Sequence, residues 1–260
     1  MSAGENTPDL WRHLLPRPAA DGHKYDRGHA VILAAPALTG ATRLAAEACS
    51  RMGTGLVSVL ATERGDVYRA SLPSDIMVSE GHIADIRKPT VLLAGCGGVA
   101  GAHEAVLHGP PDDVVMVLDA EAIGKGLPAP SDQPAILTPH EGEFARFFPD
   151  IEGDKLDRAR AAAERTNAIV VLKGAETVIT AADGRAVVNR HASPWLAKAG
   201  TGDVLAGMIA GLAAQDMPPF DAACAGVWIH GEAGRRIGPG LVAGDIASEV
   251  PGILARLLNE

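Results

Sequence analysis

The sequence predicts an α/β protein with a mostly parallel, doubly wound central sheet. Short apolar segments of strand type alternate along the chain with segments whose apolar residues recur at helical spacing. Glycine or polar clusters directly follow several of the apolar segments, as expected where strands end at a ligand-binding rim. Because successive parallel strands need a crossover, usually a helix, this alternation predicts helices on both faces of the sheet.

The expected elements follow the chain in order. The expected strands are 30–35, 56–61, 74–78, 91–99 with its glycine cluster, a strand in 114–123 ending at Asp119, 135–139, 168–174 and the two arms of 177–189. The expected helices are 40–52, 63–71, 101–108, 141–148, 154–166, a glycine-led helix from about 200, 221–237 and 245–258. Asp183-Gly184 predicts a β-hairpin, the one clear antiparallel element. Residues 1–22 are expected to be a peripheral lead-in, and 23–260 a single domain.

Composition excludes several classes of function. The formal net charge of −9 and the aromatic content of 3% argue against general binding of nucleic acid. The cysteines, Cys49, Cys96 and Cys224, are expected to be buried, reduced thiols of a cytoplasmic protein. The N-terminus lacks a signal-peptide pattern, and the longest apolar run, 204–214, is far shorter than the roughly 20 residues of a membrane span. We expect no membrane partner.

The stretch 195–212, WLAKAGTGDVLAGMIAGL, is the strongest candidate for a functional site. Gly200, Thr201 and Gly202 interrupt an apolar sequence where a helix is expected to begin, and Asp203 lies in its first turn. Free N–H groups and the positive end of the helix dipole bind anions, so a carboxylate here can act as a base beside a bound phosphate. The alternative is that Asp203 only complements the helix dipole.

Other clusters are expected at the same rim of the sheet. They are Gly95–Gly98, Asp119, Thr138–Glu143, Lys173-Gly174 and Gly200–Asp203. Such convergence favours a ligand site over chance. There is no G-x-x-x-x-G-K-[ST] motif, so a P-loop is excluded.

Three residues of these clusters have candidate roles in phosphoryl transfer. Lys173 is placed to put its ammonium group near a phosphate, unless it is an ordinary charged residue at a strand end. Glu143 is a candidate to hold Mg²⁺ through water, and the alternative is a helix-capping acid. His140 is expected to contact substrate rather than metal, because no second histidine is spaced to join it.

With these residues identified, the chain resembles the ADP/ATP-dependent NAD(P)H-hydrate dehydratases of the ribokinase-like superfamily. The resemblance runs from about His23 to the C-terminus and rests on seven segments in this order: HKYDRGHAVILAA, GATRLAAEACSRMGTGLVSV, AGCGG, VVMVLDAEAI, AILTPHEGEFARF, VVLKGAETVITAADGR and LAKAGTGDVLAGMIAGL. It implies a three-layer αβα fold with a β-hairpin and C-terminal helices.

The resemblance also implies an activity. These enzymes restore damaged NADH or NADPH by removing water from its hydrate, using ADP or ATP as phosphoryl donor with Mg²⁺. The hydroxyl of the hydrate is phosphorylated, and phosphate then leaves more readily than hydroxide. The family often forms tetramers, and a separate epimerase protein is expected to interconvert the hydrate epimers, because this chain is short for a second domain.

The family's site residues are carried over by position. Asp203 is the implied base on the hydroxyl of the hydrate. The implied nucleotide contacts are Lys173, Gly174, Ala175, Glu176, Thr177, Gly200, Thr201 and Gly202. The implied contacts to the hydrated nicotinamide nucleotide are Ala41, Gly97, His140 and Asp203.

The sequence departs from the family in three places. Tyr25 stands where the first motif usually has glycine, Cys96 and Gly98 replace residues of a Gly-Pro-Gly-Leu-Gly turn, and 189–195 differs from the usual Asn-Pro-Thr-Gly-Asn pattern. These changes bear on substrate and nucleotide contacts. Two alternatives to a dehydratase are a kinase of the same fold acting on a vitamin-precursor alcohol, and a catalytically silent nucleotide-binding protein.

Overall fold

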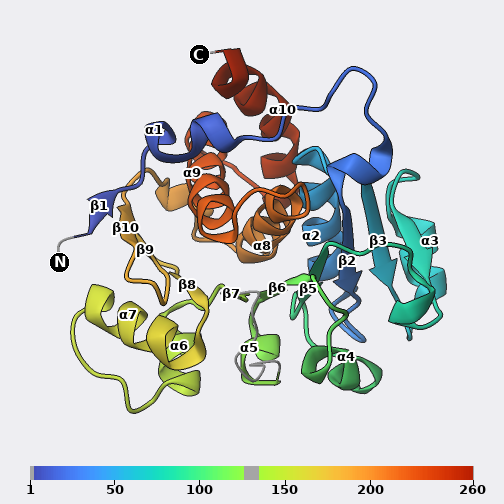
Figure 1. The fold of residues 1–260 in the computed structure, drawn as a ribbon, viewed down its shortest axis with the longest axis horizontal. Coiled ribbons are helices and arrows are strands. Elements are labelled where there is room, and N and C mark those ends of the chain that lie inside the picture. The colour runs from blue at the N-terminus through green and yellow to red at the C-terminus, as the bar shows by residue number, and fades with distance from the viewer. Residues whose placement is uncertain (1–2, 126–134, 260) are drawn as a thin grey trace.

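A single mixed sheet organises the chain (Figure 1). The computed structural model describes residues 3–125 and 135–259. Within these residues ten strands hydrogen-bond in the order β1-β10-β9-β8-β7-β6-β5-β2-β3-β4. The strands are β1 (Gly4–Glu5), β2 (His29–Leu33), β3 (Leu56–Leu60), β4 (Met77–Ser79), β5 (Val91–Ala94), β6 (Val115–Leu118), β7 (Ile136–Leu137), β8 (Ile169–Leu172), β9 (Thr177–Thr180) and β10 (Ala186–Asn189).

Helices cover both faces of this sheet. The α-helices are α1 (Pro8–Trp11), α2 (Thr39–Arg51), α3 (Gly65–Ser71), α4 (Glu104–His108), α5 (Glu121–Lys125), α6 (Glu141–Phe147), α7 (Lys155–Thr166), α8 (Thr201–Ala213), α9 (Pro219–Ile237) and α10 (Ala243–Asn259). Short 3-10 turns are η1 (Arg12–Leu14), η2 (Lys24–Arg27), η3 (Ile83–Asp85), η4 (Gly101–His103) and η5 (Pro194–Leu196).

Two hydrophobic cores separate these helices into layers. On one face α2, α8 and α9 pack on the sheet through alanine-rich surfaces and α10 packs against these helices, and on the other face α4 to α7 cover the sheet (Figure 1). The central strands β2 and β5 are buried along their whole length, as parallel strands covered on both sides must be. The prediction of a three-layer αβα fold with a mostly parallel sheet is therefore confirmed.

Local sequence signals set the ends of several helices. Asp154 precedes α7 and accepts a hydrogen bond from the N–H of Asp157 at 2.9 Å, which caps that helix. Pro219 begins α9, where its missing N–H is not needed, and Gly238 ends it with φ of +70°. The expected hairpin joins β9 to β10, and the N–H of Gly184 donates to the carbonyl of Ala181 within its turn.

Four details differ from the sequence expectations. The strand ending before Asp119 is followed by a short helix, α5, that was not expected. β8 is antiparallel to β9, so antiparallel pairing extends beyond the hairpin. The segment 1–22, expected to be peripheral, supplies β1, which pairs with β10 in parallel, and Trp11, which is fully buried. Its first two residues lie outside the described part.

Candidate active site

The first turn of α8 holds the candidate base. Gly200 precedes the helix with φ of +91°, a conformation that favours glycine, and Asp203 follows in the first turn. A side chain at Gly200 would also crowd α2 and α10, since its Cβ would lie 2.8 Å from Leu44 and 3.0 Å from Ala243. Glycine therefore lets α8 begin against both helices, with Asp203 at the carboxyl end of the sheet.

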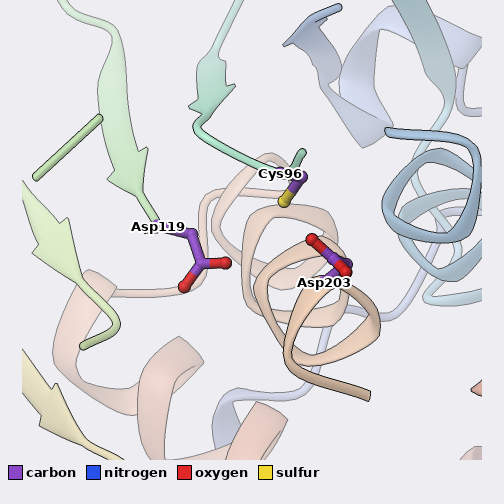
Figure 2. A group of neighbouring side chains, drawn as sticks. All are labelled: Cys96, Asp119 and Asp203. Carbon is purple, nitrogen blue, oxygen red and sulfur yellow. The ribbon is translucent and has the colours of Figure 1, made fainter. Parts of the chain in front are cut away.

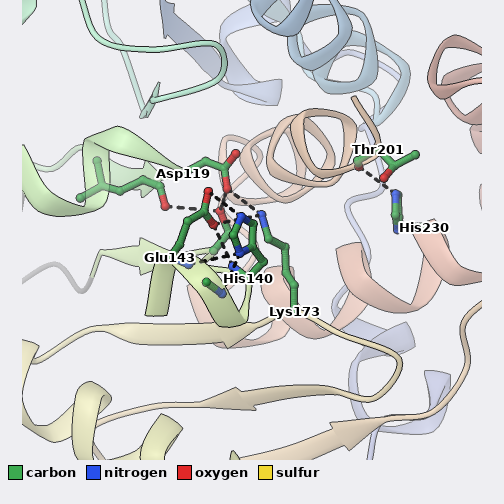
Figure 3. A network of polar contacts seen from close by, with 9 residues as sticks. Asp119, His140, Glu143, Lys173, Thr201 and His230 are labelled. Carbon is green, nitrogen blue, oxygen red and sulfur yellow. Dashed lines mark hydrogen bonds and ion pairs between the residues drawn. The ribbon is translucent and has the colours of Figure 1, made fainter. Parts of the chain in front are cut away.

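A buried ion pair faces this helix from the sheet. Lys173 follows β8, and its Nζ lies 2.9 Å from Oδ1 of Asp119, which follows β6 (Figure 3). The hydroxyl of Thr138, after β7, donates to the same Asp119 oxygen at 2.7 Å. A Cβ on Gly202 would lie only 3.3 Å from Lys173 Nζ, so the ammonium group is beside the start of α8. The structure thus brings four of the expected clusters together.

The acidity of Asp203 reflects these neighbours. Its carboxylate lies close to Cys96 and Asp119, and one ligand atom from each of the three residues is within 4.8 Å of the other two (Figure 2). Burial raises the pKa of Asp203 to about 6, and the negative charge of Asp119 acts in the same direction. The positive charge of Lys173 and the Cys96 thiol oppose this shift. At neutral pH Asp203 remains ionised but is a stronger base than an exposed aspartate.

The Cys96 thiol is unsuited to nucleophilic chemistry. It is fully buried, and burial together with the charges of Asp119 and Asp203 raises its pKa well above the usual value. Cys49 and Cys224 are also free and buried, which confirms the expectation of reduced thiols for the described chain.

The His140–Glu143 turn forms a helix cap. The ring Nδ1 of His140 accepts from the backbone N–H groups of Gly142 and Glu143, and the Glu143 carboxylate accepts from the His140 N–H at 2.8 Å. Glu143 therefore performs the capping role that was the alternative to a metal ligand. It also lies 4.0 Å from Lys173 Nζ, so this carboxylate belongs to the same charged cluster.

These carboxylates do not form a complete cage for Mg²⁺. Asp119 is engaged by Lys173 and Thr138, and the third member of its group, Cys96, offers sulfur where Mg²⁺ prefers oxygen. Mg²⁺ normally retains waters and binds through few carboxylates plus substrate phosphates. Glu143, with a side chain 12% exposed at the rim, fits a contact through water.

A cavity of about 750 Å³ opens beside α8. Its wall is formed by the β8–β9 connection, the segment before α8, and α9. It is lined by His140, Lys173, Gly174, Ala175, Thr177, Asn189, Arg190, Ala192, Ser193, Pro194, Leu196, Ala197, Lys198, Thr201, Gly202, Leu205, Val227, His230 and Gly231. None of these described lining residues is acidic, although the chain carries a net charge of −9. The cavity is therefore suited to an anion with an apolar part.

The expected nucleotide residues divide around this cavity. Six of them line it: Lys173, Gly174, Ala175, Thr177, Thr201 and Gly202. Glu176 is not among the lining residues, and its carboxylate pairs with Arg190 at 2.8 Å. Gly200 is not among them either, and its position is fixed by the close approach of Leu44 and Ala243 described above.

Three expected substrate residues, Ala41, Gly97 and Asp203, are not among the residues that line the cavity. Gly97 has φ of +86°, and a Cβ there would lie 3.0 Å from Ala41 Cβ and 2.5 Å from the Leu38 carbonyl oxygen. Ala41 and Gly97 are therefore neighbours, joining the start of α2 to the turn after β5. Cys96, next to Gly97, lies against Asp203, so Asp203 stands between this turn and the cavity.

Part of the cavity wall was not predicted from the sequence. His230 was expected only as a residue of an apolar C-terminal helix, yet it lines the cavity and its Nε2 lies 3.0 Å from the Thr201 carbonyl oxygen. Asn189, Arg190 and Ser193 were noted only as departures from a family pattern. A histidine among small residues in GVWIHGEAG was the single available signal for His230.

None of the helices in the described part of the chain is long and apolar enough to cross a membrane. In solved structures, the chain is similar to the ADP/ATP-dependent NAD(P)H-hydrate dehydratase of Bacillus subtilis co-crystallised with ATP and Mg²⁺, with a TM-score of 0.87, 27% identity and 99% of each chain covered. A hydroxyethylthiazole kinase from Pyrococcus horikoshii shares the fold alone, at 14% identity and a TM-score of 0.59.

Related sequences carry the same activity in their names. The ADP-dependent (S)-NAD(P)H-hydrate dehydratase of Xanthomonas campestris is 34% identical, with 93% of each chain covered, and that of Neisseria meningitidis is 33% identical, with 90% and 88% covered. The chain spans about half of a bifunctional NAD(P)H-hydrate repair enzyme from Moorella thermoacetica, at 34% identity. The family model for NAD(P)H-hydrate dehydratase matches residues 30–249. The chain therefore belongs to the NAD(P)H-hydrate dehydratase family.

Proposed function

We propose that this enzyme converts the 6-hydroxy hydrate of NADH or NADPH back to the reduced dinucleotide, with ADP as phosphoryl donor. The observation that carries the proposal is the position of Asp203, a carboxylate of raised pKa. It lies between the turn after β5, where Gly97 contacts Ala41 of α2, and the cavity beside α8. In this arrangement the hydrate lies against the turn and the nucleotide fills the cavity. ADP is preferred because the Xanthomonas and Neisseria relatives are named as ADP-dependent.

The first step is phosphoryl transfer. Asp203 accepts the proton of the hydrate's hydroxyl group while the hydroxyl oxygen attacks the terminal phosphorus of ADP, and AMP leaves. Backbone N–H groups at the start of α8 and the ammonium group of Lys173 stabilise the charge on the transferred phosphoryl group. Lys173 is held by Asp119 at 2.9 Å, so its position is set before the nucleotide binds.

The second step is elimination. The lone pair of the ring nitrogen expels phosphate from the adjacent ring carbon, and loss of a neighbouring proton then restores the reduced ring. The overall balance is hydrate plus ADP giving reduced dinucleotide, AMP and inorganic phosphate. Phosphorylation is needed because hydroxide is a poor leaving group, whereas phosphate is a good one.

The roles of the remaining predicted residues are proposed on position. Lys173, Gly174, Ala175 and Thr177 line the cavity wall where the nucleotide phosphates would pass, and Thr201 and Gly202 line it at the start of α8. Ala41, Gly97 and His140 contact the hydrate in this proposal. Glu176 and Gly200 support the phosphate-binding segments from outside the lining.

Mg²⁺ is proposed as the cation that enters with the nucleotide. When bound it would neutralise phosphate charge and orient the terminal phosphate. Glu143 is the proposed protein contact through a water molecule, since its carboxylate lies at the rim beside Lys173. The capping hydrogen bond uses Oε2 of Glu143, and its Oε1 lies 3.4 Å from Nε2 of His140, so the water would have to bind Oε1 beside the His140 ring.

Assembly and context are also proposals. We propose a homotetramer in the cytoplasm, working with a separate epimerase. In support, a relative about twice the length of this chain is named as a bifunctional repair enzyme, which indicates a second activity. The exposed side chains of Leu38, Trp195 and Val242 provide apolar surface for subunit contacts. Light scattering on the purified chain would give the mass of a tetramer, and the mass of a monomer would contradict this proposal.

The alternative with the same machinery is a kinase for a small alcohol, because the fold is shared with hydroxyethylthiazole kinase. Phosphorus NMR of the reaction with ADP and NADH hydrate separates the two. A dehydratase releases inorganic phosphate in a one-to-one ratio with reduced dinucleotide. Accumulation of a phosphate ester without inorganic phosphate would overturn the proposal in favour of a kinase.

A further inference from the structure

A buried histidine joins α9 to the start of α8. The side chain of His230 is in α9, and the residue is 8% exposed and lines the cavity. Its Nε2 lies 3.0 Å from the carbonyl oxygen of Thr201, the first residue of α8 (Figure 3). Within the described residues, this is the one hydrogen bond between the His230 ring and the start of α8.

The chemistry of this contact fixes the tautomer. A carbonyl oxygen can only accept a hydrogen bond, so Nε2 must carry the proton and donate it. Burial lowers the pKa of His230 to about 4, and the nearby positive charge of Lys173 acts in the same direction. The ring is therefore neutral at physiological pH, and this donor does not change with pH near neutrality.

The side chain of Thr201 anchors the same residue from the other side. Its hydroxyl lies 2.7 Å from the carbonyl oxygen of Leu196 and 2.9 Å from that of Lys198, both in the segment before α8. Thr201 is thus held between the preceding segment, through Oγ1, and α9, through its carbonyl group. The backbone at the beginning of the helix has little freedom to rotate.

Fixing this carbonyl group also fixes the N–H of Gly202. The two groups belong to one planar trans peptide unit, in which the C=O and the N–H point in opposite directions. A hydrogen bond that holds the Thr201 C=O toward α9 therefore orients the Gly202 N–H away from α9. Gly202 is the residue beside which the Lys173 ammonium group lies.

We propose that His230 is a positioning residue for phosphoryl transfer, holding the Thr201–Gly202 peptide so that its N–H points at the transferred phosphoryl group. The inference rests on the proposed function, since it assumes that the start of α8 binds that group. His230 touches neither the reacting phosphorus nor the hydroxyl in this account. Its effect is on the transition state, where an N–H must be aligned with developing negative charge.

Two substitutions separate positioning from packing. His230→Gln keeps an N–H donor at nearly the reach of Nε2, whereas His230→Leu fills similar space without a donor. We expect His230→Leu to lower kcat about 10- to 100-fold, the loss typical of a misplaced catalytic group, with little change in the dissociation constant of ADP. His230→Gln should recover most of the lost kcat.

A matched control removes another buried, hydrogen-bonded histidine. His29 in β2 contacts the Arg87 carbonyl oxygen and the Ser58 hydroxyl, each at 2.8 Å, remote from the cavity. His29→Leu should lower the melting temperature but leave the kcat of the folded protein unchanged. Melting temperatures of all variants are measured beside kcat, so that loss of folded protein is separated from loss of rate.

Three results would overturn the inference. They are an unchanged kcat in His230→Leu, an equal loss of kcat in His230→Gln and His230→Leu, or a loss that appears in the affinity for ADP rather than in kcat. A wild-type protein that lacks dehydratase activity would instead refute the proposed function. The wild-type measurement therefore distinguishes the two failures.

Discussion

The ammonium nitrogen of Lys173 lies 2.9 Å from Oδ1 of Asp119, and this buried pair stands beside the Asp203 carboxylate. The pair places opposite charges near the candidate base. Asp119 raises the pKa of Asp203, while Lys173 lowers it. The strength of the base is therefore a balance between burial, one like charge and one opposite charge.

Replacing Lys173 by methionine should destabilise the protein and weaken nucleotide binding. The change leaves Asp119 buried without its cation, which typically costs about 3–5 kcal/mol of unfolding free energy. As a control, Lys125→Met removes a lysine paired with Glu104 and Glu121 at the surface, and should cost much less unfolding free energy, because solvent screens such pairs. Urea denaturation gives the unfolding free energy of both variants. Equal decreases in the two variants would contradict a special role for the Lys173–Asp119 pair.

The pH dependence of kcat/KM should report Asp203. A general base works only when ionised, so activity should fall as the pH drops through about 6, the pKa to which burial raises this group. The acidic limb of the kcat/KM profile should lie at a clearly higher pH than it would for an exposed aspartate. An initial-rate pH profile of the purified enzyme gives this directly. Activity that persists undiminished to pH values near the usual aspartate pKa would show that Asp203 is not the base.

Asp203→Asn should be more stable than the wild-type protein. A carboxyl group whose pKa is raised on folding destabilises the native state above that pKa, and this penalty is lost as the pH falls through about 6 and below. The amide avoids it, so we expect a gain of about 1–3 kcal/mol near neutral pH, from a pKa shift worth 1.36 kcal/mol per unit. Melting curves at neutral and acidic pH measure this difference, and a gain independent of pH would contradict the explanation.

Cys96 should tune the base without taking part in bond making. Its thiol hydrogen-bonds to Asp203 and thereby lowers the pKa of that carboxyl group. Cys96→Ala should therefore move the acidic limb of kcat/KM to higher pH. Cys49→Ala is the control, because Cys49 is equally buried but bonds to Thr54 instead. A limb that does not move in Cys96→Ala, or moves equally in both, would exclude this role.

The turn after β5 allows a matched pair of glycine substitutions. Gly97 and Gly98 both have positive φ, so alanine strains the backbone at either position. Only at Gly97 would the new Cβ meet backbone, 2.5 Å from the Leu38 carbonyl oxygen, whereas at Gly98 the first atom is 3.6 Å away. We expect Gly97→Ala to raise KM for the hydrate much more than Gly98→Ala. Equal effects in steady-state kinetics would argue against substrate contact at Gly97.

The sequence was sufficient to predict the layers and the rim of the sheet. Strand-helix alternation placed Asp119, Thr138 and Lys173 at carboxyl ends of strands, and these residues are indeed in contact. Parallel strands bring their carboxyl ends to one edge whatever their order, so this convergence needs no tertiary information. The helix start at Gly200–Asp203 was also predictable without tertiary information, because glycine and first-turn signals are local in the sequence.

Other features depended on packing that a linear pattern does not contain. The contact of His230 with Thr201 joins residues 29 positions apart on two helices, and only their packing angle creates it. Trp11 lies within the expected lead-in, yet it is buried because α1 packs on α9, where its ring centroid lies 5.9 Å from that of Trp228. Helix α5 was missed because its five residues are too few to show a helical period.

The most direct test of the central claim follows the near-ultraviolet absorbance of the reduced nicotinamide ring. Purified protein is given NADH hydrate and Mg²⁺ with ADP, with ATP or with neither, and Asp203→Asn is run in parallel. We predict a rise in absorbance that requires nucleotide, is faster with ADP, and vanishes in the variant. No rise with either nucleotide, from protein that still binds ADP, would contradict the assignment of this chain as a dehydratase.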